Sequence, residues 1–412
     1  MRILFIHQNF PAQFVHLAPE LARRGHDVLA LTSDTNKRAS KVRTARYVYS
    51  GPGPAPKQPA APLPRLAATF AESAARGEAV ARACENLRVK HGFTPDVVFG
   101  HIGWGETLFL REIWPDARHL LYAELFYRPR GLDTGFDLEV QRDDVWQRVW
   151  ITSRQAHLLL AMTGADEAVA PTGWQAASFP AEQRAKIRVI HDGIDTDLLV
   201  PDPTATFTLP GGALTLRAGD EVLTFVNRNL EPYRGYHIFM RALPAVLAAR
   251  PTAQVVIVGG EGTSYGTRPP GGGSWKTRFL DEVKDRLDLS SVHFVGNLPY
   301  PQFVDLMRVS RVHAYSTYPF VLSWSMLEAM SVGALVVGSA TPPVAEVLVD
   351  GHNGRLVDFF DVPAWSATLI QCLAEPQRFA QMRDAARRTI VERYDLRTVC
   401  LPAMTAFVEG GE

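Results

Sequence analysis

The sequence predicts an α/β protein built from two Rossmann-like domains that face each other across a cleft. Short apolar segments alternate with helix-forming segments along most of the chain, and a strand, a helix and a strand within about 30 residues are typical of a parallel sheet. The same alternation occurs in both halves. At 412 residues the chain exceeds the size of one ordinary domain, so we expect two domains of about 200 residues each.

The composition narrows the class of protein further. Apolar residues make up 46% of the chain, which is enough for two cores, and the formal net charge of zero argues against bulk attraction to nucleic acid. The three cysteines, Cys84, Cys372 and Cys400, lie far apart in the sequence. This spacing predicts reduced thiols in a cytoplasmic protein, and it offers no metal site.

Nothing in the sequence predicts a segment that crosses a membrane. Met1–Phe10 is expected to be a strand rather than a signal peptide, and no run approaches the ~18 apolar residues of a span. The helix expected at Leu66–His91 carries arginines interleaved with glutamates, which favours a solvated face. A weak peripheral contact with the inner face of the membrane stays open as the alternative.

The first domain is expected to span residues 1–197. Its first strand is Arg2–His7, and Pro11 opens a helix that runs to Arg24, because proline fits the first helical turn. The next strand begins at His26, just after a glycine. The remaining expected elements are strands at 46–50, 96–100, 119–123, 167–170 and 187–190, and helices at 66–91 and 136–162.

Two polar residues stand where expected strands of this domain end. His101 follows one strand and Glu124 follows another. Ligands of open α/β sheets bind beyond the carboxyl ends of the strands, so we expect both side chains to face the cleft. Two alternatives stay open, namely a solvated loop histidine and a Glu124 carboxylate paired with Arg128 or Arg130.

The second half of the chain is expected to repeat this architecture. A linker with a small insertion is expected at 198–220, which is rich in Pro, Gly and Thr, the second domain at 221–390, and the last helix within 391–412. A strand near 254–258 ends in Gly259, and the Gly/Pro-rich loop after it suggests a lid or a specificity element. Other expected elements are strands at 222–226, 292–295, 312–315 and 355–357, and helices at 236–249, 301–307 and between 363 and 392.

The most informative stretch runs from Pro319 to Gly354. It predicts a helix at 324–332, capped by Ser323 or Ser325, and then a buried strand. Free N–H groups and the positive end of the helix dipole suit a phosphate at the start of this helix. The residues concerned are Leu322, Ser323 and Trp324. Glu328 lies one turn further on, within reach of a sugar or ribose hydroxyl, and a capping box with Ser325 is the alternative for its carboxylate.

The run from Leu327 to Val337, followed by Glu346, Asp350-Gly351 and Gly354, resembles the donor-site signature of the family-4 (group 1) retaining glycosyltransferases, which have the GT-B fold. The resemblance covers nearly the whole chain at fold level and is most specific in residues 226–357. It implies that the first domain binds the acceptor, that the second binds a nucleotide sugar, and that the last helix crosses back onto the first domain.

The resemblance also assigns roles to individual residues. Glu328 matches the second of two family glutamates, the one that binds the ribose. The first would fall at position 320, where this chain has Phe320, so the chain resembles a divergent branch that lacks it. Arg228 and Arg234 match cations that hold the donor diphosphate, and guanidinium groups can do so without a metal ion. Gly259 is expected beside them.

In the first domain the chain departs from the family at two places. Pro11-Ala12-Gln13-Phe14 replaces a glycine pair, and the N–H groups of Ala12 and Gln13 are still expected on the acceptor side. The family commonly has a histidine where this chain has Glu124. We therefore take His101 and Glu124 as the candidate catalytic residues, and we expect Glu124 to provide a sugar-hydroxyl contact that Phe320 cannot.

The function implied is metal-independent transfer of a sugar, with retention, from a UDP- or GDP-sugar to a hydroxyl of a glycan, a lipid-linked glycan or a small molecule. No further cofactor is implied. The acceptor would attack the face from which the diphosphate leaves. Two alternatives stay open: a non-catalytic nucleotide-sugar-binding protein, because Phe320 and Glu124 depart from the pattern, and a sugar-nucleotide epimerase on the same architecture.

Overall fold

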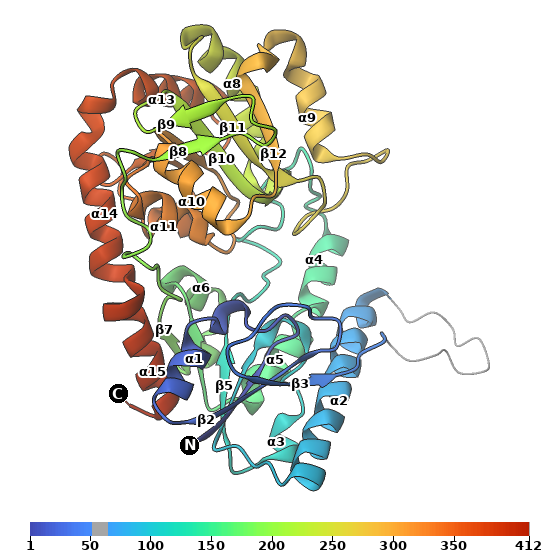
Figure 1. The fold of residues 1–412 in the computed structure, drawn as a ribbon. Helices are drawn as coiled ribbons and strands as arrows, with labels where there is room; N and C mark the ends of the chain where they lie inside the picture. The colour runs from blue at the N-terminus through green and yellow to red at the C-terminus, as the bar shows by residue number, and fades with distance from the viewer. Residues whose placement is uncertain (52–64, 412) are drawn as a thin grey trace. The chain divides into compact units, whose positions relative to one another are not determined.

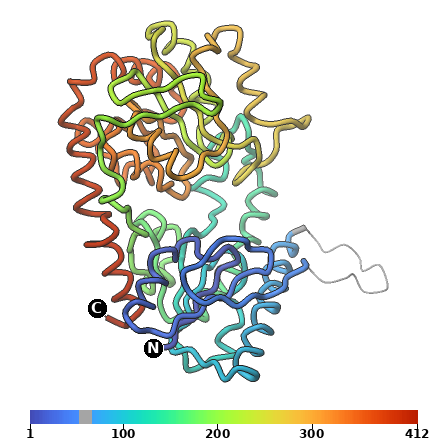
Figure 2. The backbone as a smooth tube through the Cα atoms, in the orientation of Figure 1, coloured from blue at the N-terminus to red at the C-terminus, as the bar shows by residue number. Residues whose placement is uncertain are grey.

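The computed structural model describes residues 1–51 and 65–411, which form two compact units (Figure 1). Unit 1 comprises Met1–Asp192 and Arg397–Glu412, and unit 2 comprises Gly193–Leu396. The last segment of the chain therefore belongs to the same unit as the first. In Figure 2 the two ends of the chain lie near each other within unit 1.

Unit 1 is built on a seven-stranded parallel sheet with the strand order β3-β2-β1-β4-β5-β6-β7. The strands are β1 (Arg2–Ile6), β2 (Asp27–Ser33), β3 (Arg43–Tyr47), β4 (Val97–His101), β5 (Arg118–Tyr122), β6 (Glu167–Ala170) and β7 (Ile187–Val189). The helices are α1 (Leu17–Arg23), α2 (Arg65–His91), α3 (Leu110–Ile113), α4 (Val145–Ser153), α5 (Ala156–Gly164), α6 (Gly173–Ser178), α7 (Ala181–Arg184) and α15 (Leu401–Glu409). Because apolar side chains line both faces of the central strand β1, the sheet is covered by helices on both sides.

Helix α15 completes one face of this core. Its residues Met404, Phe407 and Val408 are buried against a cluster that includes Phe5 and Phe14. α15 also packs against α1, so the two ends of the chain meet in one hydrophobic layer.

Unit 2 is built on a six-stranded parallel sheet with the strand order β12-β11-β10-β13-β14-β15. The strands are β10 (Val222–Asn229), β11 (Gln254–Gly260), β12 (Val292–Gly296), β13 (Val312–Tyr315), β14 (Leu335–Ser339) and β15 (Arg355–Val357). The helices are α8 (Tyr236–Ala249), α9 (Trp275–Val283), α10 (Tyr300–Val309), α11 (Trp324–Ser331), α12 (Pro342–Ala345), α13 (Val362–Ala374) and α14 (Ala380–Tyr394). The predicted pair of parallel, Rossmann-like α/β sheets is confirmed.

The segment expected to be a linker is part of unit 2. It forms an antiparallel hairpin of β8 (Thr206–Thr208) and β9 (Thr215–Arg217). Phe207, Leu209 and Leu216 are buried in the core of unit 2. This role could not be predicted from the sequence. Both strands are very short, have one apolar residue each, and lie among threonine, proline and glycine.

Several other boundaries differ from the expected ones; β3, for example, spans Arg43–Tyr47 rather than 46–50. In place of the helix expected at 136–162 the structure has α4 and α5. The Asp144 carboxylate caps α4 by accepting a 2.8 Å hydrogen bond from the Gln147 N–H, so this helix begins only at Val145. The helix expected from Pro11 is a 3-10 turn, η1 (Ala12–Phe14), followed by α1. The division between the units falls after Leu396 rather than near 390, since α14 continues to Tyr394.

The structure also bears on the cysteines and on the possibility of a membrane-spanning helix. All three cysteines are buried and none forms a disulfide. Of the helices in residues 1–51 and 65–411, none combines the length and the hydrophobicity that crossing a membrane requires.

Candidate functional site

In unit 1, four polar side chains meet at the carboxyl ends of the neighbouring strands β1, β4 and β5. His7 follows β1, His101 ends β4, and Glu124 follows β5, while Gln13 comes from η1. One Glu124 carboxylate oxygen lies 3.6 Å from His101 Nε2, and the other lies 3.4 Å from Gln13 Nε2. The structure thus brings together His101, Glu124 and Gln13, which the sequence analysis had singled out.

The His101 ring is fixed from several sides. It is 1% exposed and stacks on Trp104 and Tyr122, with ring centroids 4.3 Å and 5.5 Å away. Its Nδ1 accepts a 2.9 Å hydrogen bond from the Gly103 N–H. The solvated loop histidine that remained an alternative is therefore not what the structure contains. A ring held in this way can present only its Nε2 atom to a ligand.

His7 is a site residue that the sequence analysis missed. It is 2% exposed, and its ring centroid lies 5.4 Å from that of His101. Burial, and then the neighbouring His101 and Arg38, hold the pKa of His7 well below its usual value, while Gln13 partly opposes this shift. His7 is consequently neutral at physiological pH. Its only local signal is a polar residue directly after an apolar strand, and that signal alone does not mark a site residue.

Ala12 takes a backbone conformation that usually belongs to glycine. Its φ of 41° is the only positive φ of a non-glycine residue in the part of the chain that the structure describes. For a residue with a Cβ atom this region costs about 1–2 kcal/mol. The turn at Ala12 is thus strained, and it brings the Gln13 side chain toward Glu124.

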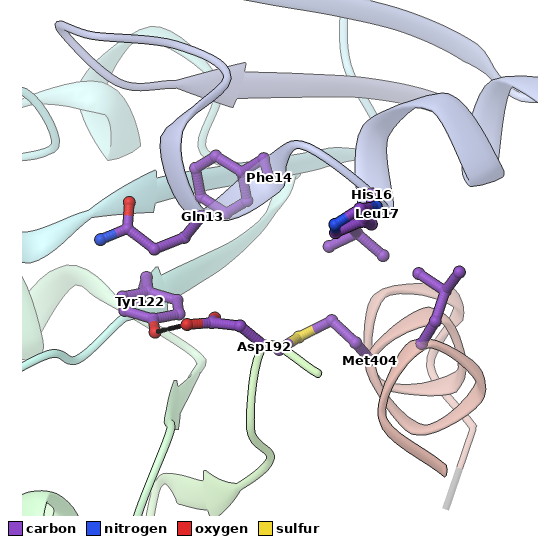
Figure 3. A pocket seen from close by; sticks show the side chains of 8 residues that line it. Gln13, Phe14, His16, Leu17, Tyr122, Asp192 and Met404 are labelled. Atoms are coloured by element: carbon purple, nitrogen blue, oxygen red, sulfur yellow. Dashed lines mark hydrogen bonds between the residues drawn. The ribbon is translucent and has the colours of Figure 1, made fainter. Parts of the chain in front are cut away.

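A small cavity of about 10 Å³ lies below this turn, between Gln13, Phe14, Tyr122, Asp192 and the start of α15 (Figure 3). Such a volume suits about one water molecule and is too small for a sugar. The Tyr122 hydroxyl donates to both Asp192 carboxylate oxygens, at 2.9 and 3.0 Å. This bond fixes the tyrosine on which His101 stacks.

Arg128 does not serve as the partner that had been considered for Glu124. Its guanidinium donates to the carbonyl oxygens of Ala177, Ser178 and Phe179, where α6 ends. The Gln175 side chain in turn donates a 2.6 Å hydrogen bond to the Glu124 carbonyl. These contacts hold the backbone that follows β5.

In unit 2, Arg234 is a buried cation near the start of α11. It is 5% exposed, and its Nη1 donates to Thr317 Oγ1 at 2.8 Å and to the Val321 carbonyl at 2.9 Å. Burial alone would lower the pKa of Arg234, but Tyr315, Tyr265 and Glu231 raise it above its usual value. Within the described residues no carboxylate lies within ion-pair distance of this guanidinium.

Arg228 and Gly259 lie at neighbouring strand ends. Arg228 is exposed near the end of β10, and Asn229 pairs with Gly260 of β11. Gly259 has a φ of 155°, and a Cβ atom there would stand 2.8 Å from Leu230 Cδ2 and 3.0 Å from the Asn227 carbonyl oxygen. Only glycine fits this approach, so Gly259 allows the two strand ends to come together.

Helix α11 begins as predicted. Ser323 is its N-cap and accepts a 3.4 Å hydrogen bond from the Ser325 N–H, while the Ser323 N–H donates to the Tyr315 hydroxyl at 2.8 Å. Leu322 is buried and the Trp324 side chain is 40% exposed. The N–H groups of this first turn are thus positioned beside a tryptophan that solvent can reach.

Glu328 is 8% exposed and lies on α11, where its Oε1 accepts a 2.8 Å hydrogen bond from the Tyr300 hydroxyl of α10. Burial raises the pKa of Glu328 to about 7, and the bond from Tyr300 opposes this shift. The capping box with Ser325 does not form, because Ser323 caps the helix instead. Tyr300 was not predicted, since nothing in its local sequence links it to Glu328.

The loop after β11 is anchored by a residue that the sequence analysis also missed. The buried Glu231 carboxylate accepts hydrogen bonds of 3.1–3.4 Å from the N–H groups of Ser264, Tyr265 and Gly266. The Tyr265 ring consequently lies 5.0 Å from the Arg234 guanidinium. Glu231 therefore ties the loop to the buried cation.

Phe320 packs into this same group. It is 7% exposed, its ring centroid lies 4.9 Å from that of Tyr265, and the Arg234 guanidinium lies 5.7 Å from its ring. At position 320 this chain thus has an aromatic wall beside Arg234. The wall shields the cation from water, and Glu231, the carboxylate whose charge raises the pKa of Arg234, does not approach it closely enough for an ion pair.

Two family models match the chain. The model described as "Glycosyl transferase family 4 group" matches residues 24–199, and the model described as "Glycosyl transferases group 1" matches residues 213–389. The first covers most of unit 1 and the second covers most of unit 2.

The chain is also similar in sequence to individual glycosyltransferases. A D-inositol 3-phosphate glycosyltransferase of Mycolicibacterium smegmatis is 28% identical over 204 residues, which are 48% of this chain and 42% of that protein. A protein of the same name from Gordonia bronchialis is 25% identical over 391 residues, or 90% of this chain and 77% of that protein. The match to the first therefore spans less than half of that protein.

One solved structure shows how far the similarity of fold extends. Anabaena Alr3699/HepE, in complex with UDP-glucose, has a TM-score of 0.64 at 15% identity, and the match covers 100% of both chains. At this identity the likeness shows a shared fold.

Proposed function

Because this chain belongs to the family-4, group 1 glycosyltransferases and has their GT-B fold, we propose that it transfers a sugar from a nucleoside-diphosphate sugar to an acceptor hydroxyl, with retention and without a metal ion. A UDP-sugar is the favoured donor, since the related Anabaena structure contains UDP-glucose. The acceptor is a glycan, a lipid-linked glycan or a polyhydroxylated small molecule, and D-inositol 3-phosphate, named in the relatives, is the first to try.

The buried charge of Arg234 is the observation that carries this proposal. An ionised group removed from water is costly unless an opposite charge is near it. Arg234 is held by neutral oxygens of Thr317 and Val321, with aromatic rings of Tyr265 and Phe320 beside it. The charge of Glu231 is near enough to raise the pKa of Arg234 but forms no ion pair with it, and a diphosphate at this place would supply that direct partner.

Other residues of unit 2 support the same ligand. Arg228 is exposed and can approach a second phosphate oxygen, and the first turn of α11 offers N–H groups. Glu328 would accept hydrogen bonds from the ribose hydroxyls, with Tyr300 holding one of its oxygens. Phosphate and ribose contacts of this kind are what a nucleotide sugar requires.

In the proposed reaction these groups act mainly on the leaving group. Arg228, Arg234 and the start of α11 stabilise the charge that develops on the departing diphosphate. The acceptor hydroxyl attacks the same face of the sugar, and a phosphate oxygen takes its proton. His101 and Glu124 of unit 1 bind hydroxyl groups of the substrates and do not form a covalent intermediate.

The proposal is tested with the full chain and a panel of UDP-, GDP- and ADP-sugars, with and without D-inositol 3-phosphate. We expect UDP to raise Tm, because a ligand of the folded state stabilises it by mass action. We also expect release of nucleotide in EDTA and, by NMR, a product that keeps the anomeric configuration of the donor. If no nucleotide raises Tm and none is released, the proposed function is wrong.

A further inference from the structure

Two buried histidines of unit 1 have their tautomers set by the backbone. The Asn9 N–H donates a 2.9 Å hydrogen bond to His7 Nδ1, and the Gly103 N–H does the same to His101 Nδ1. A backbone N–H is always a donor, so both Nδ1 atoms are acceptors and both neutral rings carry their proton on Nε2. Neither Nε2 makes a hydrogen bond within the described residues. The site therefore contains two N–H donors of fixed orientation.

Two acceptors lie beside these donors. Gln13 Oε1 is buried and makes no hydrogen bond within the part of the chain that the structure describes. The Glu124 carboxylate lies 3.6 Å from His101 Nε2, which is longer than a hydrogen bond but short enough for one atom to bridge the two groups. Buried polar atoms without partners are rare in native proteins, and each suggests a ligand or a water.

We propose that His7, His101, Gln13 and Glu124 form a subsite for two neighbouring hydroxyl groups of a polyol, with both histidines as hydrogen-bond donors. Each hydroxyl would accept one Nε2–H and donate its own proton to Gln13 Oε1 or to Glu124. The proposal deepens the function proposed above and rests on it for the source of the hydroxyls, which is either the transferred sugar or the acceptor.

The balance of donors and acceptors favours hydroxyl groups over charged ligands. A phosphate could accept from both histidines, but its negative charge would be repelled by Glu124. An ammonium group would leave both Nε2–H groups unpaired. Trp104 adds the kind of apolar wall that a sugar ring packs against. Its ring centroid lies 5.1 Å from that of His7 and 4.3 Å from that of His101.

Gln13 and Glu124 form the outer edge of this subsite. The Glu124 side chain is 32% exposed, whereas both histidines are almost fully buried. The bond from Gln13 Nε2 to Glu124 is long, at 3.4 Å, and therefore weak. The Gln13 side chain is thus the group that moves when the hydroxyls enter.

The test uses paired substitutions of the histidines. In His7→Asn and His101→Asn the amide oxygen can still accept the backbone N–H, but the Nε2–H donor is gone. In His7→Gln the side chain can still donate near the Nε2 position. The exposed His91→Asn in the same unit is the matched control. Each protein is assayed with a glucose-based donor or acceptor and with its monodeoxy forms.

We expect the wild type to disfavour one deoxy form by about tenfold in kcat/KM, the effect of one hydrogen bond. This preference should nearly vanish in His7→Asn or His101→Asn, return partly in His7→Gln and persist in His91→Asn. Deoxy donors and deoxy acceptors are varied separately, which identifies the source of the hydroxyls. An unchanged preference in both Asn variants would overturn the proposal.

Failure of the proposed function would look different. If no nucleotide sugar is used, the Tm of the wild type is measured with glucose and with myo-inositol. A rise in Tm that both Asn variants lose would support the subsite without any transfer activity. No rise with either polyol, or a rise with inorganic phosphate alone, would count against the subsite. A cooperative thermal transition at an unchanged Tm without ligand shows that the Asn variants remain folded.

Discussion

The Tyr300 hydroxyl donates a 2.8 Å hydrogen bond to Glu328 Oε1, and so α10 holds one oxygen of a carboxylate that α11 carries. The second oxygen is left for a ligand. A carboxylate fixed in this way needs no reorientation when a ribose binds, which reduces the entropy lost on binding.

We predict that Glu328→Gln weakens UDP binding by about 1–3 kcal/mol, because a hydrogen bond to a charged group is lost. Tyr300→Phe should have a smaller effect in the same direction, since it removes only the orienting bond. Isothermal titration calorimetry measures both, with the exposed Glu392→Gln as the control. Equal affinity in wild type and Glu328→Gln would remove Glu328 from the proposed ribose site.

The pKa of about 7 for Glu328 predicts how stability depends on pH without nucleotide. The unfolded carboxyl group loses its proton near 4.5 and the folded one near 7, so the folded state binds more protons between these values. Stability therefore falls as pH rises through this window, by at most about 3 kcal/mol, and the loss is complete above it.

Glu328→Gln should abolish this contribution. Urea unfolding at pH 5 and pH 8 measures this contribution. The free energy of unfolding of the variant, minus that of the wild type, should be about 2–3 kcal/mol larger at pH 8 than at pH 5. A constant difference between wild type and variant at the two pH values would show that the pKa of Glu328 is not raised.

The two arginines predict a reaction that needs no metal. Arg228→Ala should raise the activation free energy that corresponds to kcat/KM by about 2–4 kcal/mol, because the charge on the leaving diphosphate loses a stabilising cation. Arg234→Lys keeps the charge but loses the planar fork, and it should also slow transfer. Arg228 is exposed, so its variant should stay folded. Arg234 is buried, so a change there also tests stability. Loss of activity in EDTA that magnesium or manganese restores would contradict the metal-independent mechanism.

Glu124→Gln should separate transfer from nucleotide binding. The carboxylate is proposed to bind a sugar hydroxyl, whereas the groups proposed for UDP all belong to unit 2. Transfer should therefore slow by about 1–3 kcal/mol in activation free energy while the Kd for UDP stays unchanged. Glu139→Gln, at an exposed position of unit 1, is the matched control. Full transfer activity in Glu124→Ala would show that Glu124 has no substrate contact.

Much of the fold and part of the candidate site could be predicted from local sequence. Both sheets follow from the alternation of apolar strands with helices, and the resemblance to the family-4 glycosyltransferases singled out Glu328 and Arg234. His7, Glu231 and Tyr300 could not be found in this way. Each acts through a residue brought near it only by the tertiary fold: His101 for His7, the loop N–H groups for Glu231 and Glu328 for Tyr300.

The place of α15 has a consequence for how the chain is made. Unit 1 contains the first 192 residues and the segment from Arg397 onward, and Met404, Phe407 and Val408 close its core against Phe5 and Phe14. Unit 2 is continuous in sequence, so a ribosome can deliver all of it before α15 is synthesised. The apolar layer around Phe5 and Phe14 therefore stays incomplete until the last helix is synthesised. Unit 2 can therefore reach its native state first, although it is encoded second.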